Sequence, residues 1–317
     1  MTDTQNEVFK TPVNKIRLFE HGAPGSQNLK LTRKYYTEDM PDGRVKHIVQ
    51  NITDPDIVPY IPDGIGNSTD RQRIPAVLII PGGAFRRLVY NFEGEDVAKW
   101  LNSMGIAAFV LECRLPSDEH DNAEDVPLID AMRVMRVIRG RAQEFGIDEA
   151  KIGVMGFSAG GFMAALLSTA YESDVYADYK YKDEYDKLSA RPDFAVCSYP
   201  VISIDDCIEA GKRYMSEEQV LKRISDSKAK ILHKYNPDKL VRPDMPPVFI
   251  CETDDDRTTL SENSVGFYMA ARKAGVSAEL HIFRTGGHGY GCGDDFAQTG
   301  EWKVLFTKWI KSIGIIS

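Results

Sequence analysis

Six nearly continuous apolar runs, all after Pro75, constrain the fold more than any other feature of the sequence. They are AVLII, IAAFVLEC, KIGVMGF, DFAVCSYP, PVFICET and AELHIF. A strand with one exposed face alternates apolar and polar residues, whereas a strand buried on both faces is apolar throughout. Helical patterns separate the runs, among them EDVAKWLNSM, DVPLIDAMRVMRVIRGRAQEF, LSENSVGFYMAARKAG and EWKVLFTKWIKSI. This alternation predicts a doubly wound α/β sheet of mostly parallel strands with helices on both faces.

The N-terminal region has a different pattern. Short runs such as IRLFE and LKLTRKYY alternate apolar and polar residues, and turn-forming pairs follow them at Asp42-Gly43 and Asp54-Pro55. Such alternation is typical of strands with one exposed face. We therefore expect residues 1–75 to form an antiparallel β lead-in to the sheet.

Two polar stretches interrupt the rhythm of strand and helix. Residues 203–244 contain the helix-favouring segment SEEQVLKRISDSKAKILHKY, and residues 176–192 read YADYKYKDEYDKLSARP. We interpret both as insertions over the edge of the sheet. No repeat, low-complexity tract or linker divides the chain, so one domain is predicted over residues 1–317.

Composition and charge limit the class of protein. Of the 317 residues 43% are hydrophobic and 27% are charged, as in soluble globular proteins. The formal net charge is -8 and the basic residues form no patch, which argues against nucleic acid or a membrane surface as partner and favours a small neutral ligand. No apolar run approaches the ~20 residues that span a bilayer, and the N-terminus lacks the apolar core of a signal peptide.

The number and spacing of the cysteines indicate the redox environment of the protein. They are Cys113, Cys197, Cys207, Cys251 and Cys292. Their number is odd and they lack the close pairing of a zinc site. We therefore expect buried thiols without a metal, in a reduced, cytoplasmic environment.

The segment KIGVMGFSAGGFMAALL places Ser158 between a buried strand and an apolar helix. A helix that begins directly after a strand directs its free N–H groups and its positive dipole end toward the junction. A serine there has to adopt a strained turn, which requires small residues two positions before and after it. Gly156 and Gly160 meet this requirement. The pattern and its setting predict a nucleophile elbow.

A serine hydroxyl needs a neighbouring base to become a strong nucleophile. His288 lies in the loop RTGGHGYG after the last apolar run, and the glycines on both sides allow this loop to reach over the end of the sheet. His281 falls inside the run AELHIF, so we expect it to pack or to point outward. The sequence therefore favours His288 as the base.

An imidazolium that forms during catalysis needs a buried carboxylate beside it. The candidates are Asp254, Asp255 and Asp256, which follow the strand PVFICET. Three adjacent aspartates cannot all face one histidine, and the residues alone leave the choice open. The order serine, aspartate, histidine is that of α/β-hydrolases.

An oxyanion formed in acyl transfer needs backbone N–H donors. Ala159, directly after the nucleophile, is expected to supply one. The loop in LIIPGGAF follows an earlier strand, and Gly82 and Gly83 allow its N–H groups to turn toward the serine. This loop is predicted to complete an oxyanion hole.

Together these elements resemble the α/β-hydrolase superfamily, and within it the acetyl-xylan-esterase-like and hormone-sensitive-lipase-like esterases. The resemblance extends from about Ala76 to the C-terminus, and its segments are PGGAF with EGEDVAKWLNSMG, GFSAGGFMAALL, SYPVIS, ETDDDRTT and GGHGYG. It implies an α/β-hydrolase fold with 203–244 as a small helical insertion over the active site. It also implies Asp256 as the acid, with Asp255 as the second choice, and it implies Gly83 and Ala84 as oxyanion donors beside Ala159.

Two departures from these relatives affect the interpretation. The lipase-like His-Gly-Gly-Gly loop is Pro-Gly-Gly-Ala here, which favours the acetylesterase branch. The Val-Pro expected after the acid is Thr-Leu, which leaves the choice among the aspartates open. The resemblance implies a serine esterase that acts on a short acyl ester, such as an O-acetyl group on a sugar or xylo-oligosaccharide, without a metal or cofactor.

Other interpretations remain beside this one. The same residues suit a general carboxylesterase or a peptidase of the prolyl-oligopeptidase type, and a silent ligand-binding protein could retain the scaffold. The tyrosines of YESDVYADYKYKDEYDKL are candidates for a sugar-stacking surface, against an ordinary solvated insertion. Arg86 and Arg87, beside the Pro-Gly-Gly loop, are candidates for contacts with substrate hydroxyls or for plain surface positions.

Overall fold

The structure, a computed structural model, describes residues 9, 14–64, 73–213, 215–224, 227–293 and 298–317. The other residues lie outside this description. They include residues 1–8, 10–13 and 65–72 of the expected lead-in, and residues 214 and 225–226 of the expected helical insertion.

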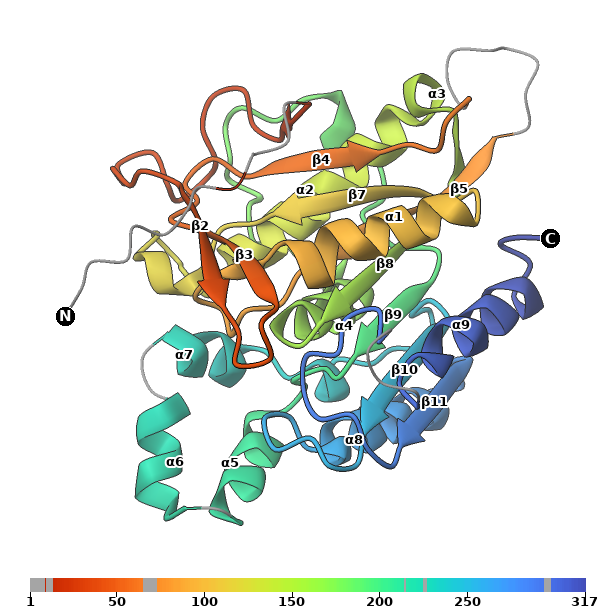
Figure 1. The fold of residues 1–317 in the computed structure, drawn as a ribbon. Helices are drawn as coiled ribbons and strands as arrows, with labels where there is room; N and C mark the ends of the chain where they lie inside the picture. Colours follow the sequence, from red (N-terminus) through yellow and green to blue (C-terminus); the bar gives the residue numbers. More distant parts are fainter. Residues whose placement is uncertain (1–8, 10–13, 65–72, 214, 225–226, 294–297) are drawn as a thin grey trace.

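In the described part of the chain the central sheet has eight strands in the order β1-β4-β7-β5-β8-β9-β10-β11 (Figure 1). Their bounds are β1 (Ile16–Arg17), β4 (Asp56–Tyr60), β5 (Ile74–Ile80), β7 (Ala107–Glu112), β8 (Ile147–Phe157), β9 (Ala195–Ser198), β10 (Val248–Thr253) and β11 (Ala278–Phe283). From β7 to β11 every neighbouring pair is parallel, while β4 pairs antiparallel with both β1 and β7. The expected α/β-hydrolase fold is confirmed.

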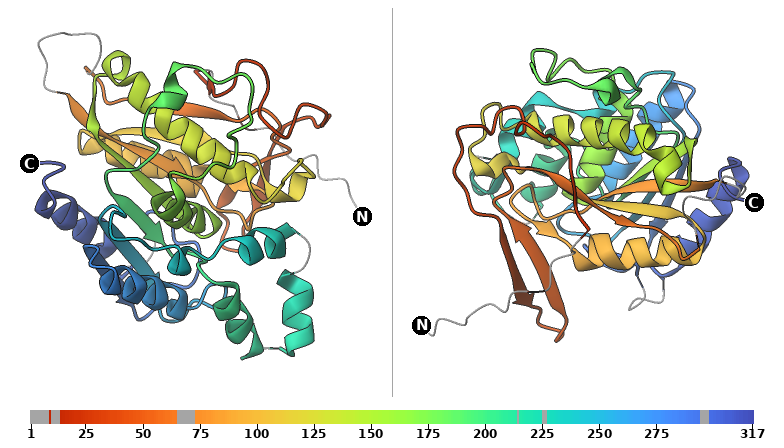
Figure 2. Two further views of the ribbon diagram at one scale, coloured as in Figure 1. Left: turned by 180° about the vertical axis from the view of Figure 1, so that it is seen from behind. Right: turned by 90° about the horizontal axis from the view of Figure 1, so that it is seen from above.

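Helices cover both faces of the sheet. Their bounds are α1 (Asp96–Ser103), α2 (Val126–Gly140), α3 (Ala142–Phe145), α4 (Ala159–Ala170), α8 (Ser261–Lys273) and α9 (Glu301–Ser312). Helices α1 and α9 lie on one face, and α2, α4 and α8 lie on the other (Figures 1 and 2). Between α1 and α9, the ring centroids of Trp100 and Trp302 are 5.0 Å apart. The sheet is therefore shielded on both sides, as its continuous apolar runs require.

The N-terminal lead-in divides between two sheets. Strands β1 and β4 extend the central sheet, whereas β2 (Lys34–Asp39) and β3 (Val45–Gln50) form an antiparallel hairpin. The hairpin pairs with β6 (Leu88–Val89), and the N–H of Val89 donates to the carbonyl of Gly82 in the Pro-Gly-Gly loop at 2.9 Å. The lead-in thus supports that loop, a role that the alternation of its residues did not indicate.

Residues 203–244 are largely helical, as expected. They contain α5 (Ile204–Lys212), α6 (Glu217–Ile224), α7 (Ser227–Lys234) and the short 3₁₀ helix η4 (Pro237–Lys239). The end of α7 is tied to the start of α2, because Lys234 Nζ donates to Asp125 Oδ2 at 2.7 Å. Figure 1 shows α5 and α6 projecting from the body of the molecule beyond α7.

Several tyrosines of the segment 171–188 are engaged within the fold. Tyr176 Oη donates to Asp186 Oδ1 at 2.9 Å, Tyr179 Oη donates to the carbonyl of Gly22 at 2.9 Å, and the Arg133 guanidinium lies 5.6 Å from the centre of the Tyr185 ring. Residues 184–187 form a 3₁₀ helix, η3 (Glu184–Lys187), that packs against α2. These contacts anchor the segment to the protein, and they occupy the hydroxyls of Tyr176 and Tyr179 and the ring of Tyr185.

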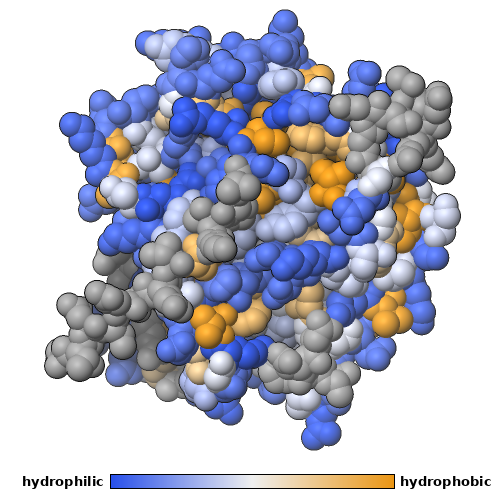
Figure 3. Space-filling model, turned by 45° about the horizontal axis from the view of Figure 1, so that its top comes forward, coloured by the Kyte–Doolittle hydropathy of each residue, from blue (hydrophilic) through white to orange (hydrophobic). Residues whose placement is uncertain are grey.

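The surface and the cysteines agree with the composition. On the face shown in Figure 3, hydrophobic residues form small patches separated by hydrophilic ones. Among the described residues, no helix has both the length and the apolar character needed to cross a membrane. Cys113, Cys197 and Cys251 are buried thiols, while Cys207 and Cys292 are half-buried.

A fully buried ion pair fixes the N-terminal region to the core. Arg114, just after β7, donates to Asp130 of α2 from Nη2 at 2.7 Å and from Nε at 3.0 Å, and both side chains have 0% exposure. The same guanidinium donates to Ser26 Oγ at 2.8 Å and to the carbonyl of Pro24. Removal of one partner from such a pair leaves a buried charge without compensation.

We expect Asp130→Ala to lower the free energy of unfolding by about 3–5 kcal/mol, because Arg114 would remain buried without its carboxylate. Glu144→Ala is the control, since Glu144 forms a more exposed pair with Arg141 and should cost less than about 1 kcal/mol. Denaturant titration followed by tryptophan fluorescence measures both. Equal losses of unfolding free energy in the two variants would contradict the stabilising role of the buried pair between Arg114 and Asp130.

Candidate active site

A single residue joins β8 to α4. The strand ends at Phe157, the helix begins at Ala159, and Ser158 lies between them with φ 54° and ψ -117°. A non-glycine residue with positive φ is strained and persists only when its surroundings hold it. The apolar strand and helix on either side are buried, and they provide that support.

The glycines beside Ser158 are required by close backbone contacts. A Cβ on Gly156 would lie 1.9 Å from the carbonyl oxygen of Gly160, and a Cβ on Gly160 would lie 1.9 Å from that of Ile80. No side chain fits at such distances. The elbow geometry expected from the sequence is therefore present, and it is packed against the end of β5.

His288 reaches Ser158 from the loop that follows β11. Its Nε2 lies 2.8 Å from Ser158 Oγ, although 130 residues separate the two in sequence. Gly286, Gly287 and Gly289 all have positive φ, so the loop adopts turns that other residues avoid. His281, by contrast, lies on β11 with its Nε2 2.7 Å from Glu279 Oε1.

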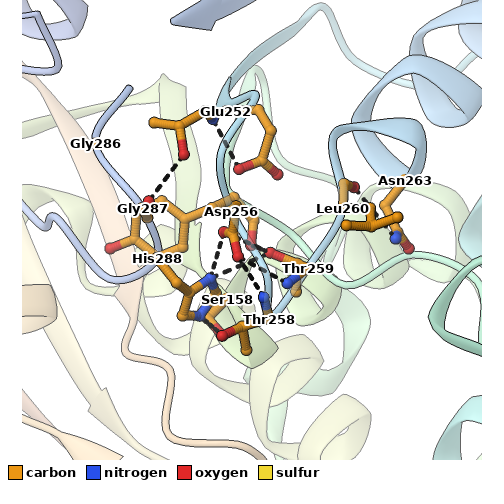
Figure 4. A network of polar contacts seen from close by, with 12 residues as sticks. Ser158, Glu252, Asp256, Thr258, Thr259, Leu260, Asn263, Gly286, Gly287 and His288 are labelled. Atoms are coloured by element: carbon orange, nitrogen blue, oxygen red, sulfur yellow. Dashed lines mark hydrogen bonds and ion pairs between the residues drawn. The ribbon is translucent and has the colours of Figure 1, made fainter. Parts of the chain in front are cut away.

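Asp256 holds the other nitrogen of the imidazole. His288 Nδ1 lies 2.6 Å from Asp256 Oδ2, and this contact is one of the dashed lines in Figure 4. The carboxylate has 1% exposure, and its Oδ1 accepts the N–H groups of Thr258 at 2.6 Å and Thr259 at 2.9 Å. A carboxylate can only accept, so Nδ1 carries the proton and Nε2 is left as an acceptor toward the serine.

The neighbouring aspartates have different positions. Asp255 Oδ1 accepts the N–H groups of Gly286 at 3.0 Å and Gly287 at 2.8 Å, so it holds the backbone of the histidine loop instead of the ring. Asp254 is exposed. Of the three candidates, the structure brings only Asp256 to the imidazole.

A second buried acid lies beside Asp256. Burial raises the pKa of Glu252 well above its ordinary value, and the Asp256 carboxylate adds to this rise. Glu252 Oε1 accepts the N–H of Thr253 at 2.9 Å (Figure 4). Glu252 sits within an apolar strand and had no sequence signal apart from its charge.

The expected oxyanion donors lie next to the nucleophile. Ala159 is the first residue of α4, and N–H groups in a first helical turn have no acceptor within their helix. Gly83 and Ala84 have φ of 139° and 60°, and a Cβ on Gly83 would lie 2.0 Å from the carbonyl oxygen of Arg87. The N–H of Gly82 is already donated to Glu93 Oε2 at 2.8 Å. Gly82 is therefore not a free donor, and the expected donors Gly83 and Ala84 follow it in the loop.

A cavity of about 260 Å³ opens at Ser158. Its lining is mostly apolar and comes from the oxyanion loop, the elbow, the segment after Asp256 and the helices α5 to α7: Ala84, Phe85, Ser158, Ala159, Val201, Cys207, Gly211, Met215, Val220, Leu232, Arg257, Thr258 and Thr259. The helical insertion therefore covers the site, as expected. Among the described residues Arg257 is the arginine of this lining, while Arg86 is exposed outside it and Arg87 pairs with Glu38.

This arrangement suits nucleophilic catalysis. The serine hydroxyl, the imidazole and the carboxylate are ordered so that a proton can pass from Oγ to Nε2 while Asp256 compensates the charge that forms.

Within the residues that the structure describes, no group of three or more His, Cys, Asp or Glu side chains is arranged to hold a metal ion.

Comparison with known proteins agrees with the fold. The BD-FAE family model matches residues 65–270. The chain is 31% identical over 240 residues to an acetylxylan esterase from Xylanibacter ruminicola, in a match that covers 75% of this chain and 45% of that protein. The chain thus spans less than half the length of this curated relative.

Solved structures match a larger share of this chain than the curated relative does. The crystal structure of an acetyl ester-xyloside bifunctional hydrolase from Caldicellulosiruptor lactoaceticus is 34% identical, with a TM-score of 0.72 and coverage of 96% of this chain and 98% of that one. A carboxylesterase from Lactobacillus plantarum shares the fold at 19% identity, with a TM-score of 0.67 and coverage of 90% and 99%.

We expect Gly160→Ala to slow the labelling of Ser158 by a fluorophosphonate about 100-fold, because the new Cβ would displace the turn. Gly266→Ala is the control. Apart from the backbone of its own helix, α8, the nearest atom to its new Cβ is Asp206 Oδ2 at 3.8 Å, so labelling should be unchanged and stability should rise by about 0.5–1 kcal/mol. Mass spectrometry of the labelled protein gives the rates. Labelling of Gly160→Ala at the wild-type rate would show that the elbow tolerates a side chain.

Proposed function

This chain belongs to the BD-FAE family of α/β hydrolases, and we propose that it is a serine esterase that removes acetyl groups from carbohydrates such as xylo-oligosaccharides. The observation that carries the proposal is the contact of Ser158 Oγ with His288 Nε2 at 2.8 Å and of His288 Nδ1 with Asp256 Oδ2 at 2.6 Å. Three segments far apart in sequence supply these groups.

In the first half of the reaction, Ser158 attacks the ester carbonyl. As the bond from Oγ to the carbonyl carbon forms, the hydroxyl proton moves to His288 Nε2 and the carbonyl electron pair moves to its oxygen. Asp256 keeps Nδ1 protonated and offsets the charge of the imidazolium. The tetrahedral intermediate then expels the alcohol, which takes the proton from Nε2 as the carbon–oxygen bond breaks.

Backbone donors stabilise the oxyanion of that intermediate. The N–H of Ala159 and those of Gly83 or Ala84 take this role, and loss of one such donor costs roughly 3 kcal/mol of transition-state stabilisation. The strained loop and the helix start hold these groups in place before substrate arrives, so no reorganisation is needed during the reaction.

Water completes the cycle. It attacks the acyl-enzyme carbonyl while His288 Nε2 takes one of its protons, and the second tetrahedral intermediate releases the carboxylic acid as that proton returns to Ser158 Oγ. Each full turn therefore consumes one ester and one water and regenerates the free hydroxyl.

Three observations support a short acyl group on a sugar. The matched proteins from Xylanibacter ruminicola and Caldicellulosiruptor lactoaceticus carry acetylxylan esterase and acetyl ester-xyloside hydrolase as their names. The loop Pro81-Gly82-Gly83-Ala84 departs from the lipase-like pattern. The cavity of about 260 Å³ lies just below the ~300–1,000 Å³ usual for small-molecule sites, which suits a short acyl group with one sugar ring.

We expect wild-type protein to release acetate from acetylated xylo-oligosaccharides, and Ser158→Ala to lose at least about 10⁴-fold in kcat. The same assay compares p-nitrophenyl acetate with the octanoate, and with proline-containing dipeptide amides. Preference for acetyl esters supports the proposal, because a long chain exceeds the cavity.

Two results would favour the rivals. Higher kcat/KM on octanoyl esters or on peptide amides would identify a general carboxylesterase or a peptidase of the prolyl-oligopeptidase type. Equal turnover by wild type and Ser158→Ala would remove the serine mechanism and favour a silent ligand-binding protein.

The three adjacent aspartates provide an internal comparison. We expect Asp256→Ala to lower kcat by about 10⁴-fold, because the imidazole would lose its partner. Asp255→Ala, which releases the backbone of the histidine loop, should lose about 10-fold, and the exposed Asp254→Ala should stay within about 2-fold. Steady-state kinetics on an aryl acetate measure all three. A larger loss for Asp255→Ala than for Asp256→Ala would contradict the assigned roles.

A further inference from the structure

A buried carboxylate that the steps above do not use lies beneath the site. Glu93 belongs to one turn of π-helix, η1 (Asn91–Glu95), between β6 and α1, and has 5% exposure. Its Oε2 accepts the N–H of Gly82 at 2.8 Å, and its Oε1 accepts the hydroxyl of Tyr199 at 3.0 Å. Both carboxylate oxygens are occupied as acceptors.

These bonds join two catalytic loops. Gly82 begins the oxyanion loop. Tyr199, just after β9, has 0% exposure, and its hydroxyl accepts the N–H of Gly291 at 3.0 Å, three residues beyond His288. The Tyr199 ring also lies edge-on to the His288 ring at 5.0 Å. One carboxylate therefore connects the oxyanion loop to the histidine loop through a single tyrosine.

Close packing leaves the carboxylate little freedom. A Cβ on Gly82 would lie 2.7 Å from Glu93 Oε2 and 2.9 Å from Ser158 Cβ, so the carboxylate and the nucleophile flank the same glycine. A Cβ on Gly291 would lie 2.7 Å from the carbonyl oxygen of Phe92, so η1 packs directly on the histidine loop. Single-turn π-helices are frequent at functional sites.

The position of Glu93 also has an electrostatic consequence. Burial raises the pKa of Glu93, while the imidazole of His288 and the hydrogen bonds from Tyr199 and Gly82 oppose this rise. A nearby negative charge favours a cationic imidazole. Polar groups from several elements surround Glu93 and His288. They are Asp256 and Thr259 after β10, Ser158 at the elbow, Tyr199 after β9, Glu252 behind Asp256 and Lys46 on β3.

We propose that Glu93 is a positioning residue for the esterase reaction: it fixes the oxyanion loop relative to the histidine loop, and its charge stabilises the imidazolium of His288. The inference rests on the proposed function, in which that imidazolium exists between proton uptake from Ser158 and proton delivery to the alcohol. Glutamine does not reproduce the carboxylate, because Gly82 and Tyr199 donate to different oxygens and glutamine has an NH2 donor in place of one of them.

The test compares variants of the full chain on p-nitrophenyl acetate from pH 5 to 9. Glu93→Gln should lower kcat about 10–100-fold with KM within about 2-fold. It should also move the acid limb of kcat/KM down by about 0.5–1 pH unit, because the imidazolium loses a favourable charge and gives up its proton at lower pH. Tyr199→Phe keeps the Glu93 carboxylate, so it should lower kcat without moving the acid limb of kcat/KM. Glu95→Gln, two residues along the same turn and paired with Lys99, is the control and should match wild type.

The outcomes separate this inference from the proposed function. Wild-type turnover that Ser158→Ala abolishes establishes the serine mechanism, and the Glu93 variants then report on Glu93 alone; a wild type without turnover removes both proposals. Wild-type kcat in folded Glu93→Gln overturns the inference, as does a loss of kcat with an unmoved acid limb, which would leave only a structural role.

A conservative variant keeps the test decisive where Glu93→Gln fails to fold. Glu93→Asp retains the charge on a shorter side chain that cannot reach both loops, so kcat should fall several-fold while the acid limb stays in place. Hydrogen exchange of peptides covering residues 81–87 and 286–291 should become faster in the same variant. Unchanged kcat and exchange in Glu93→Asp would overturn the inference.

Discussion

The strained turn at Ser158 is the constraint on which the site depends. A serine with φ 54° and ψ -117° is unfavourable by about 1–3 kcal/mol, and it persists because a buried strand and a buried helix hold it from both sides. Gly156 and Gly160 admit the backbone contacts that lock the turn against β5. The result is a hydroxyl raised at a helix N-terminus, where negative charge is favoured. Stability elsewhere in the sheet thus maintains a reactive conformation at one residue.

The rest of the site converges there because the sheet is parallel. The carboxyl ends of β5, β8, β9, β10 and β11 lie at one edge, and the loops that follow them carry Ala84, Ser158, Tyr199, Asp256 and His288. Buried or loop-facing carboxylates then fix these loops by accepting backbone N–H groups: Asp256 from Thr258 and Thr259, Asp255 from Gly286 and Gly287, and Glu93 from Gly82. Asp256 also contacts the imidazole that has to become cationic, with its Oδ2 2.6 Å from His288 Nδ1. Loop positioning and contact with the imidazole are therefore combined in this carboxylate.

The sequence alone was sufficient to predict features that depend on a few neighbouring residues. The fold class followed from the apolar runs, and Ser158 and His288 were recognisable because their glycine neighbours are needed for backbone shapes that other residues avoid. The choice among Asp254, Asp255 and Asp256 was beyond the residues themselves, since it depends on how the chain turns after β10. Arg86 stood beside the oxyanion loop in sequence, yet Arg257 lines the cavity. Glu93 and Tyr199 had no distinguishing pattern, because their partners lie in other loops.

By itself the sequence determined the alternation of buried strands and helices and the elbow at Ser158, because hydrophobic periodicity and backbone sterics act over a few residues. Only the tertiary structure decided which acid meets His288, that Asp255 holds the loop while Asp256 holds the ring, and that Glu93 links two loops through Tyr199. Those contacts join segments separated by about 30 to more than 100 residues. Their geometry is set by the packing of the whole sheet and its loops, which no short stretch of residues contains.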